Sequence, residues 1–126
     1  MEKERQALTA KYNEDKKKHE QEFSDLAKQK REVENGRVEL FEFKKKMAKY
    51  LNSAHNRLRG KDATNEIRKL ERINAQMQHD CRRGEQGLEQ RQRDIEKRQK
   101  RLSEQSEKRE TQYHTALRNL KKEGAS

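Results

Sequence analysis

The residues best suited to chemistry are four histidines and one cysteine, and they are scattered along the chain. These residues are His19, His55, His79, His114 and Cys81. The closest pair, His79 and Cys81, would point to different sides of a helix and could not readily share a metal ion. No phosphate-binding glycine loop, nucleophile elbow or paired acids in a pocket accompany them. We therefore expect no metal, no cofactor and no enzymatic activity, with Cys81 serving as a small buried residue.

The composition favours long helices over a globular core. Of the 126 residues only 27% are hydrophobic and 44% are charged, and proline and tryptophan are absent. Such a chain suits helices joined along a narrow apolar seam. It has no apolar run of membrane-spanning length and no apolar signal-peptide region after Met1. We expect a cytoplasmic protein, with any export, alone or with a cargo, using a route without a cleaved signal.

Signals for ending one helix and starting another cluster at the middle of the chain. Gly60 can adopt the left-handed conformation that ends a helix, and Asp62 or Thr64 can N-cap the next helix. These turn residues predict that the chain folds back on itself as one all-α hairpin domain. The expected parts of domain 1–126 are a first arm of about 3–59, a turn at 60–64 and a second arm of about 65–123.

A spacing of seven residues runs through both predicted arms. The first arm has Tyr12, His19, Leu26, Val33, Leu40, Met47 and Ala54, and the second has Ile67, Asn74, Cys81, Leu88, Ile95, Leu102 and Arg109. Folding at the turn would bring Ala54 opposite Ile67, Leu40 opposite Cys81, and Tyr12 opposite Arg109. Two series in register across one turn indicate an antiparallel, coiled-coil-like hairpin. The same heptads would also suit a dimeric rod with opened arms, so a homo-oligomer is an alternative.

Two features predict weak points in this hairpin. Gly36 would lie near Gly84 and Gly87, which are either three unconnected surface glycines or a shared bend or close approach of the backbones. Farther from the turn, the second arm fills only about one core position in seven. We expect these outer halves to fray or to be stabilised by a partner chain.

The stretch from Val38 to Leu58 is richer in apolar residues than one facing helix requires. Several of its large apolar side chains lie off the heptad series, and a further apolar patch occurs near the C-terminus. Either the core is thicker near the turn or part of this face binds a helix from another protein. The predicted partner-binding residues are Phe41, Phe43, Tyr50, Leu51, Leu58, Tyr113 and Leu117.

The net charge of +10 is shared evenly by the two halves of the chain. Residues 1–60 carry 16 Lys and Arg against 11 Asp and Glu, and residues 61–126 carry 17 against 12. The basic clusters are interrupted by acids, as on the solvated face of a long helix. A nucleic-acid-associated protein is an alternative, although no basic face with interleaved aromatics indicates specific binding.

The turn sequence Leu58-Arg59-Gly60 resembles the Trp-X-Gly turn of the small helical hairpins exported by type VII secretion systems, with Leu in place of Trp. The sequence from Tyr113 to Leu117 starts like their tyrosine-based export signal. In outline the whole chain resembles the small charged helical proteins encoded beside LXG toxins of type VIIb systems. This resemblance implies a targeting or chaperone-like partner that binds the toxin's N-terminal helical domain, together with a second small helical protein.

A second resemblance is to the basic hairpin stalk proteins of flagellar and type III export. That family implies an alternative partner, an export ATPase.

Overall fold

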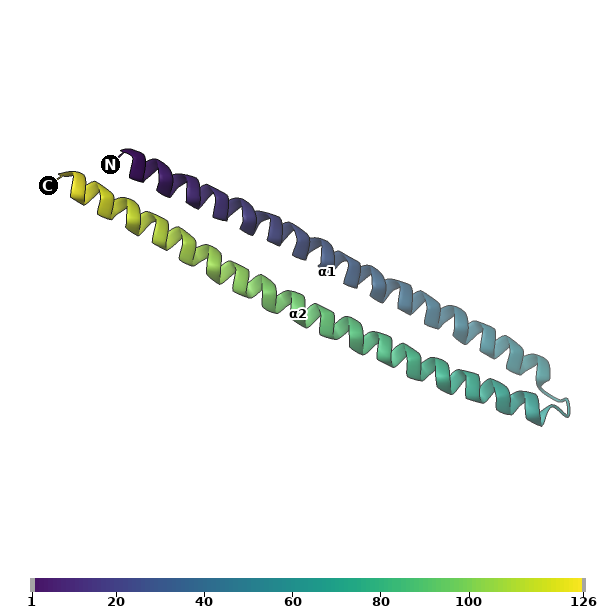
Figure 1. Cartoon of the computed structure of the whole chain (residues 1–126). Coiled ribbons are helices and arrows are strands. Elements are labelled where there is room, and N and C mark those ends of the chain that lie inside the picture. Colours follow the sequence, from purple (N-terminus) through teal and green to yellow (C-terminus); the bar gives the residue numbers. More distant parts are fainter. Residues whose placement is uncertain (1, 126) are drawn as a thin grey trace. The chain divides into compact units, whose positions relative to one another are not determined.

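The computed structural model describes residues 2–125 and consists of two helices. Helix α1 spans Glu2–Leu58 and helix α2 spans Thr64–Ala125 (Figure 1). The abundance of Lys, Arg, Glu and Gln and the absence of proline explain why helix continues through both segments. The predicted all-α, two-helix hairpin is confirmed, and the helix boundaries agree with the predicted arms within two residues.

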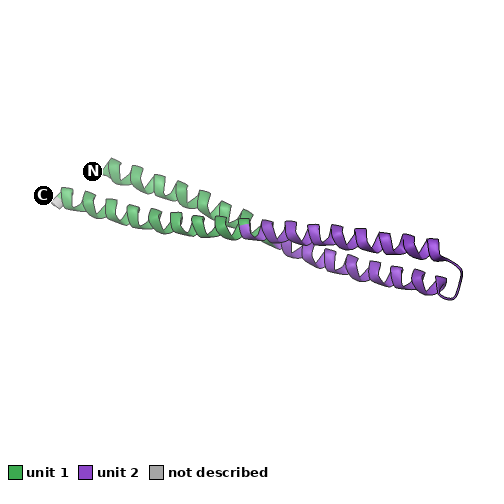
Figure 2. Cartoon of the chain, turned by 90° about the horizontal axis from the view of Figure 1, so that it is seen from below, with its two compact units in different colours: residues 1–30, 94–126 green, residues 31–93 purple. Residues whose placement is uncertain are grey.

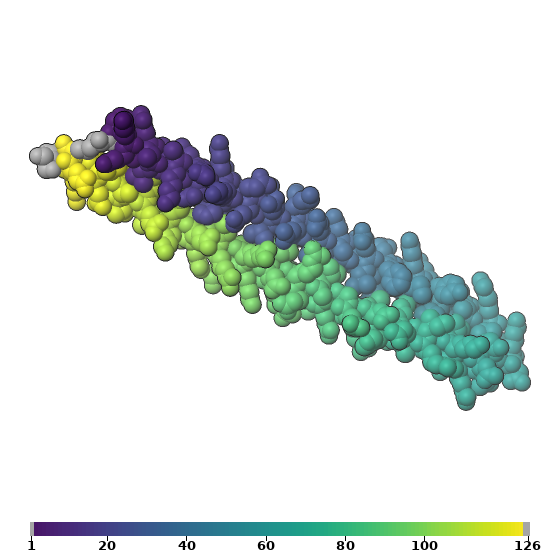
Figure 3. Space-filling model, in the orientation of Figure 1, coloured from purple at the N-terminus to yellow at the C-terminus, as the bar shows by residue number. Residues whose placement is uncertain are grey.

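The chain divides into two compact units, each with one segment from either helix. Unit 1 contains Met1–Lys30 and Asp94–Ser126, and unit 2 contains Arg31–Arg93 (Figure 2). Within each unit the two helical segments run antiparallel and their side chains lie against each other (Figure 3). The helices continue to Glu2 and Ala125 in unit 1, where the sequence predicts fraying.

The turn between the helices uses glycine as predicted but a different N-cap. Gly60 has a φ of 81°, in the left-handed region, and the Lys61 amide donates to the Leu58 carbonyl at 3.2 Å. The Ile67 amide donates to the Ala63 carbonyl at 3.0 Å. Ala63 therefore occupies the N-cap position, and the prediction of Asp62 or Thr64 was wrong. The Ala63 side chain is buried at the turn, so packing there replaces a polar cap.

The heptad series lies along the interface between the helical segments of each unit. Buried members are Leu26, Val33, Cys81, Ile95 and Leu102. Half-buried members are Tyr12, His19, Leu40, Met47, Ala54, Ile67, Leu88 and Arg109. Only Asn74 of the fourteen predicted seam positions is exposed. The periodicity therefore identified the packing face of both helices.

In unit 2 two leucines contact glycines that lie one helical turn beyond their predicted partners. Leu40 lies against Gly84, one turn beyond Cys81, and Leu88 lies against Gly36, one turn beyond Val33. In antiparallel coiled coils each side chain inserts between residues on successive turns of the facing helix. A prediction that pairs single residues across the seam therefore does not give all the residues that each side chain contacts.

The three glycines near this register have different surroundings. A Cβ on Gly36 would lie 3.1 Å from Leu88 Cδ2, and one on Gly84 would lie 3.6 Å from Leu40 Cδ2. A Cβ on Gly87 would have no neighbour within 4 Å. The close approach is therefore present at Gly36 alone, because a Cβ on Gly84 would make an ordinary van der Waals contact with Leu40 and Gly87 faces open space. Each leucine packs onto a facing glycine, and the two glycine–leucine pairs are reciprocal.

These surroundings predict different responses to alanine. Gly87→Ala should raise the free energy of unfolding by about 0.5–1 kcal/mol, because alanine favours helix and nothing opposes the added methyl. Gly36→Ala gains the same helix propensity but crowds Leu88, so its stabilisation should be clearly smaller or reversed. Urea denaturation of both variants measures the difference. Equal stabilisation by the two alanines would contradict the close packing of Leu88 on Gly36.

Candidate functional site

The exposed large hydrophobic side chains of the described residues all belong to unit 2. They are Val38, Phe41, Phe43, Tyr50 and Ile73, with exposed fractions from 48% to 65%. Aromatic side chains of this size are usually covered, and grouped exposed ones often mark binding surfaces. Their positions around the two helices therefore decide whether they form one surface.

Helical geometry separates the two exposed phenylalanines. Each residue advances about 100° around the axis, so Phe41 and Phe43 are roughly 200° apart. Phe43 and Tyr50 are seven positions apart and share one side of α1. The predicted set Phe41, Phe43 and Tyr50 is therefore divided between the two sides of the interhelical seam.

An ion pair places Ile73 on the same side as Tyr50. Arg91 Nη2 and Glu32 Oε2 lie 4.0 Å apart across unit 2. Tyr50 is 18 residues after Glu32, and Ile73 is 18 residues before Arg91, an interval of five helical turns at 3.6 residues each. Tyr50 and Ile73 therefore lie on the flank marked by this ion pair.

These residues lie on one flank of the seam and come from both helices. We call Phe43, Tyr50, Ile73 and the half-buried Met77 the aromatic face. Tyr50 lies ten positions from Leu40 toward the turn, and Ile73 lies eleven positions from Gly84 in the same direction. Because Leu40 contacts Gly84, Tyr50 and Ile73 stand at a similar level along the two helices.

The opposite side of the seam carries Phe41 in charged surroundings. Lys44 forms an ion pair with Glu85, and the Lys45 ammonium lies 5.3 Å from the centre of the Phe41 ring. A shallow hollow there is lined by Arg37, Leu40, Phe41, Lys44, Glu85 and Glu89. Phe41 is therefore separate from the aromatic face and already packed beneath a cation.

The other predicted partner-binding residues lie elsewhere. Leu51 is buried and Leu58 is half-buried, so both pack within the hairpin near the turn. Tyr113 and Leu117 are half-buried in unit 1. The site predicted from the sequence omitted Ile73 and Met77. Their positions around α2, with Ile73 on the side of Arg91 and Met77 one turn before Cys81, follow from helical geometry.

Unit 1 contains an aromatic stack where the sequence offers few apolar residues. The Tyr12 and Tyr113 rings are 4.0 Å apart between centroids and inclined by 16°. The Thr9 and Tyr113 hydroxyls are 3.1 Å apart, and the Tyr12 hydroxyl donates to Glu110 Oε1 at 2.5 Å. This stack and its hydrogen bonds join the two helices in the outer half of the chain.

A group of charged side chains lies next to the tyrosine stack. The Arg109 side chain is only 13% exposed, and its Nη1 donates to His19 Nδ1 at 2.5 Å. Its Nη2 donates to Glu110 Oε1 at 3.3 Å, and the guanidinium carbon lies 5.5 Å from the Tyr12 ring centre. A guanidinium can only donate, so His19 Nδ1 is the acceptor in this contact. The predicted proximity of Tyr12 and Arg109 is therefore present.

The tyrosine–glutamate bond shifts both pKa values. The hydrogen bond from Tyr12 lowers the pKa of Glu110 below its usual value, and the hydrogen bond and charge of Arg109 lower it further, against an opposing effect of desolvation. The same bond raises the pKa of Tyr12 above its usual value, with desolvation adding to the effect. The folded arrangement therefore favours an ionised Glu110 beside a protonated Tyr12.

Comparisons with known proteins add no family to these observations. No protein-family model matches the sequence, and no curated protein or solved structure is significantly similar to it. Within residues 2–125, no group of three or more His, Cys, Asp and Glu is placed to hold a metal ion. No helix in this part of the chain has the length and apolar character required to cross a membrane.

The lowered pKa of Glu110 predicts acid sensitivity of unit 1. Its carboxylate should stabilise the unit above the ordinary glutamate pKa of about 4.3, and this contribution should be lost as the pH falls through the lower folded-state value. The near-ultraviolet circular dichroism of the tyrosine stack should therefore decline in strong acid. Glu110→Gln should diminish this response, whereas exposed Glu104→Gln should retain it. Identical acid profiles for the two variants would contradict this role of Glu110.

Proposed function

We propose that the protein is a non-enzymatic helical hairpin that binds a helical segment of another protein through the aromatic face. The observation that carries this proposal is the placement of exposed Phe43, Tyr50 and Ile73 on one side of both helices. A third helix can insert its apolar residues into the groove beside two packed helices. The aromatic face offers such a helix apolar contacts from α1 and α2 together.

The size of this face is sufficient to contribute substantially to binding. Covering the exposed parts of three such side chains removes on the order of 300 Å² from water, worth roughly 7 kcal/mol before opposing terms. Association costs of 4–15 kcal/mol must be overcome. The face can therefore act as the central apolar contact of a complex in which polar neighbours supply further interactions.

For the partner, we propose the N-terminal helical domain of a toxin exported by a type VIIb system. Its support is the resemblance of Leu58-Arg59-Gly60 to the Trp-X-Gly turn. Leu58 ends α1 and Gly60 has the left-handed conformation that such a turn requires. In this role the protein would act in the cytoplasm as a targeting factor, with a second small helical protein, and could be exported with its cargo.

Charge substitutions on the two sides of the seam test the aromatic face. Phe43→Asp and Tyr50→Asp should each reduce recovery of the partner at least tenfold, because a carboxylate would be buried at the interface. Phe41→Asp adds the same charge on the opposite side and should have a much smaller effect. The measurement is capture by the tagged protein from its native cells, with quantitative mass spectrometry of the bound proteins.

Helicity by far-ultraviolet circular dichroism provides the structural control for these variants. Loss of helicity in parallel with loss of binding would show that Phe43 and Tyr50 are ordinary core residues. Equal effects of Phe41→Asp and Phe43→Asp would disprove a one-sided surface. Recovery of an export ATPase in place of a helical toxin would reject the type VII partner while retaining protein binding.

A further inference from the structure

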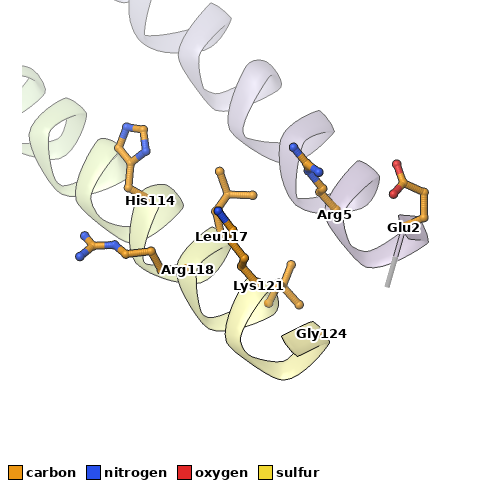
Figure 4. A pocket seen from close by; sticks show the side chains of 8 residues that line it. Glu2, Arg5, His114, Leu117, Arg118, Lys121 and Gly124 are labelled. Atoms are coloured by element: carbon orange, nitrogen blue, oxygen red, sulfur yellow. The ribbon is translucent and has the colours of Figure 1, made fainter. Parts of the chain in front are cut away.

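A second surface lies at the open ends of the helices in unit 1. A hollow of about 550 Å³ is present there, between the first turns of α1 and the last turns of α2 (Figure 4). It is lined by Glu2, Arg5, His114, Leu117, Arg118, Leu120, Lys121 and Gly124. We call this hollow the end cleft. Its volume falls within the range of pockets that bind small ligands, about 300–1,000 Å³.

The apolar part of the end cleft comes only from α2. Leu117 and Leu120 are half-buried and occur three positions apart, on one side of the helix. The lining residues of α1 are Glu2 and Arg5, which are charged and exposed. The two leucines therefore lack an apolar counterpart in the lining from α1 and retain surface that another apolar side chain could cover.

The rim of the end cleft is predominantly basic. Arg5, Arg118 and Lys121 line the end cleft together with the leucines, and Glu2 is the single acid of the lining. None of the three basic side chains forms an ion pair with another residue in the range 2–125. The His114 Nε2 atom lies 3.6 Å from Glu110 Oε2, so this side chain is directed toward the residues of the Tyr12–Tyr113 stack. The rim thus offers three cations that the described part of the chain does not neutralise.

We propose that the end cleft binds an acidic amphipathic helix of a partner protein. Apolar side chains on successive turns of that helix would cover Leu117 and Leu120. Its flanking carboxylates would pair with Arg5, Arg118 and Lys121. Charge complementarity selects this occupant over a second copy of the chain, because each copy carries a net charge of +10 and would bring further cations to the rim.

This inference is independent of the aromatic face, since the end cleft belongs to unit 1 and has different chemistry. The aromatic face is defined by aromatic and aliphatic side chains. The end cleft combines two leucines with three cations in a small hollow. The two sites could therefore recognise different segments, and the loss of one need not remove binding at the other.

A synthetic peptide of roughly 18 residues tests the proposal directly. Its leucines would follow an i, i+3, i+4, i+7 pattern, and glutamates would occupy the flanks. Fluorescence anisotropy with the full-length protein should show saturable binding that weakens as salt rises from 50 to 300 mM. A peptide with lysine in place of glutamate, and a scrambled peptide of identical composition, should each bind at least tenfold more weakly.

Matched charge reversals locate the site. Arg118→Glu and Lys121→Glu should weaken peptide binding at least tenfold, whereas Lys100→Glu, an exposed reversal elsewhere in unit 1, should change it less than threefold. Leu117→Ser should also weaken binding, and circular dichroism checks that each variant keeps its helicity. Phe43→Asp should leave peptide binding unchanged, which separates this test from that of the aromatic face.

Several outcomes would overturn the proposal. Absence of saturable binding would show that the end cleft has no affinity for an acidic amphipathic helix. Equal binding of the scrambled peptide, or equal weakening by Lys100→Glu, would show general attraction to a basic protein. Equal weakening by Phe43→Asp would show that the peptide binds the aromatic face instead.

Discussion

The scarcity of apolar residues is the constraint on which the rest of this structure depends. With only 27% hydrophobic residues, the chain can fill a narrow seam between two helices but no broad core. In unit 2 few apolar residues fill the seam, because Leu40 and Leu88 each pack onto a facing glycine. At Gly36 the missing side chain lets Leu88 lie closer to the facing helix than a Cβ would normally allow. Gly36 therefore lowers helix propensity but permits close packing.

Unit 1 also has few apolar residues, and polar and aromatic side chains make part of its helix–helix contact. Tyr12 and Tyr113 supply stacked rings, and Arg109 joins His19 to Glu110 across the interface. Such a layer depends on protonation states and geometry, whereas the glycine–leucine layers depend only on shape. The two units thus use different interactions to hold similar helical pairs. They also leave different surfaces available, an apolar one in unit 2 and a cleft with a basic rim in unit 1.

The sequence predicted the hairpin well because turn signals and heptad spacing are local properties. The turn at Gly60 depends only on the backbone conformation of that glycine. A spacing of seven places residues on one side of a helix whatever the partner helix is. The N-cap at Ala63 was missed because burial at the turn depends on both helices. The network around Arg109 was missed because side-chain pairing requires the actual offset between helices. The placement of Phe41 and Phe43 on opposite sides of the seam could have been predicted from their angular positions on a helix. It was not, because the prediction considered only how many apolar residues the stretch contains.

In the proposed binding function, the two candidate surfaces would have complementary roles. Apolar contact at Phe43, Tyr50 and Ile73 would supply affinity with little dependence on salt, since it arises from removal of surface from water. The cations around Leu117 and Leu120 would favour acidic partners, accelerate encounter and disfavour basic ones. The net charge of +10 would also oppose contact between the basic rims of two copies. The proposed binding is therefore compatible with so little apolar material, because discrimination among partners requires a correct arrangement of a few groups and not a large core.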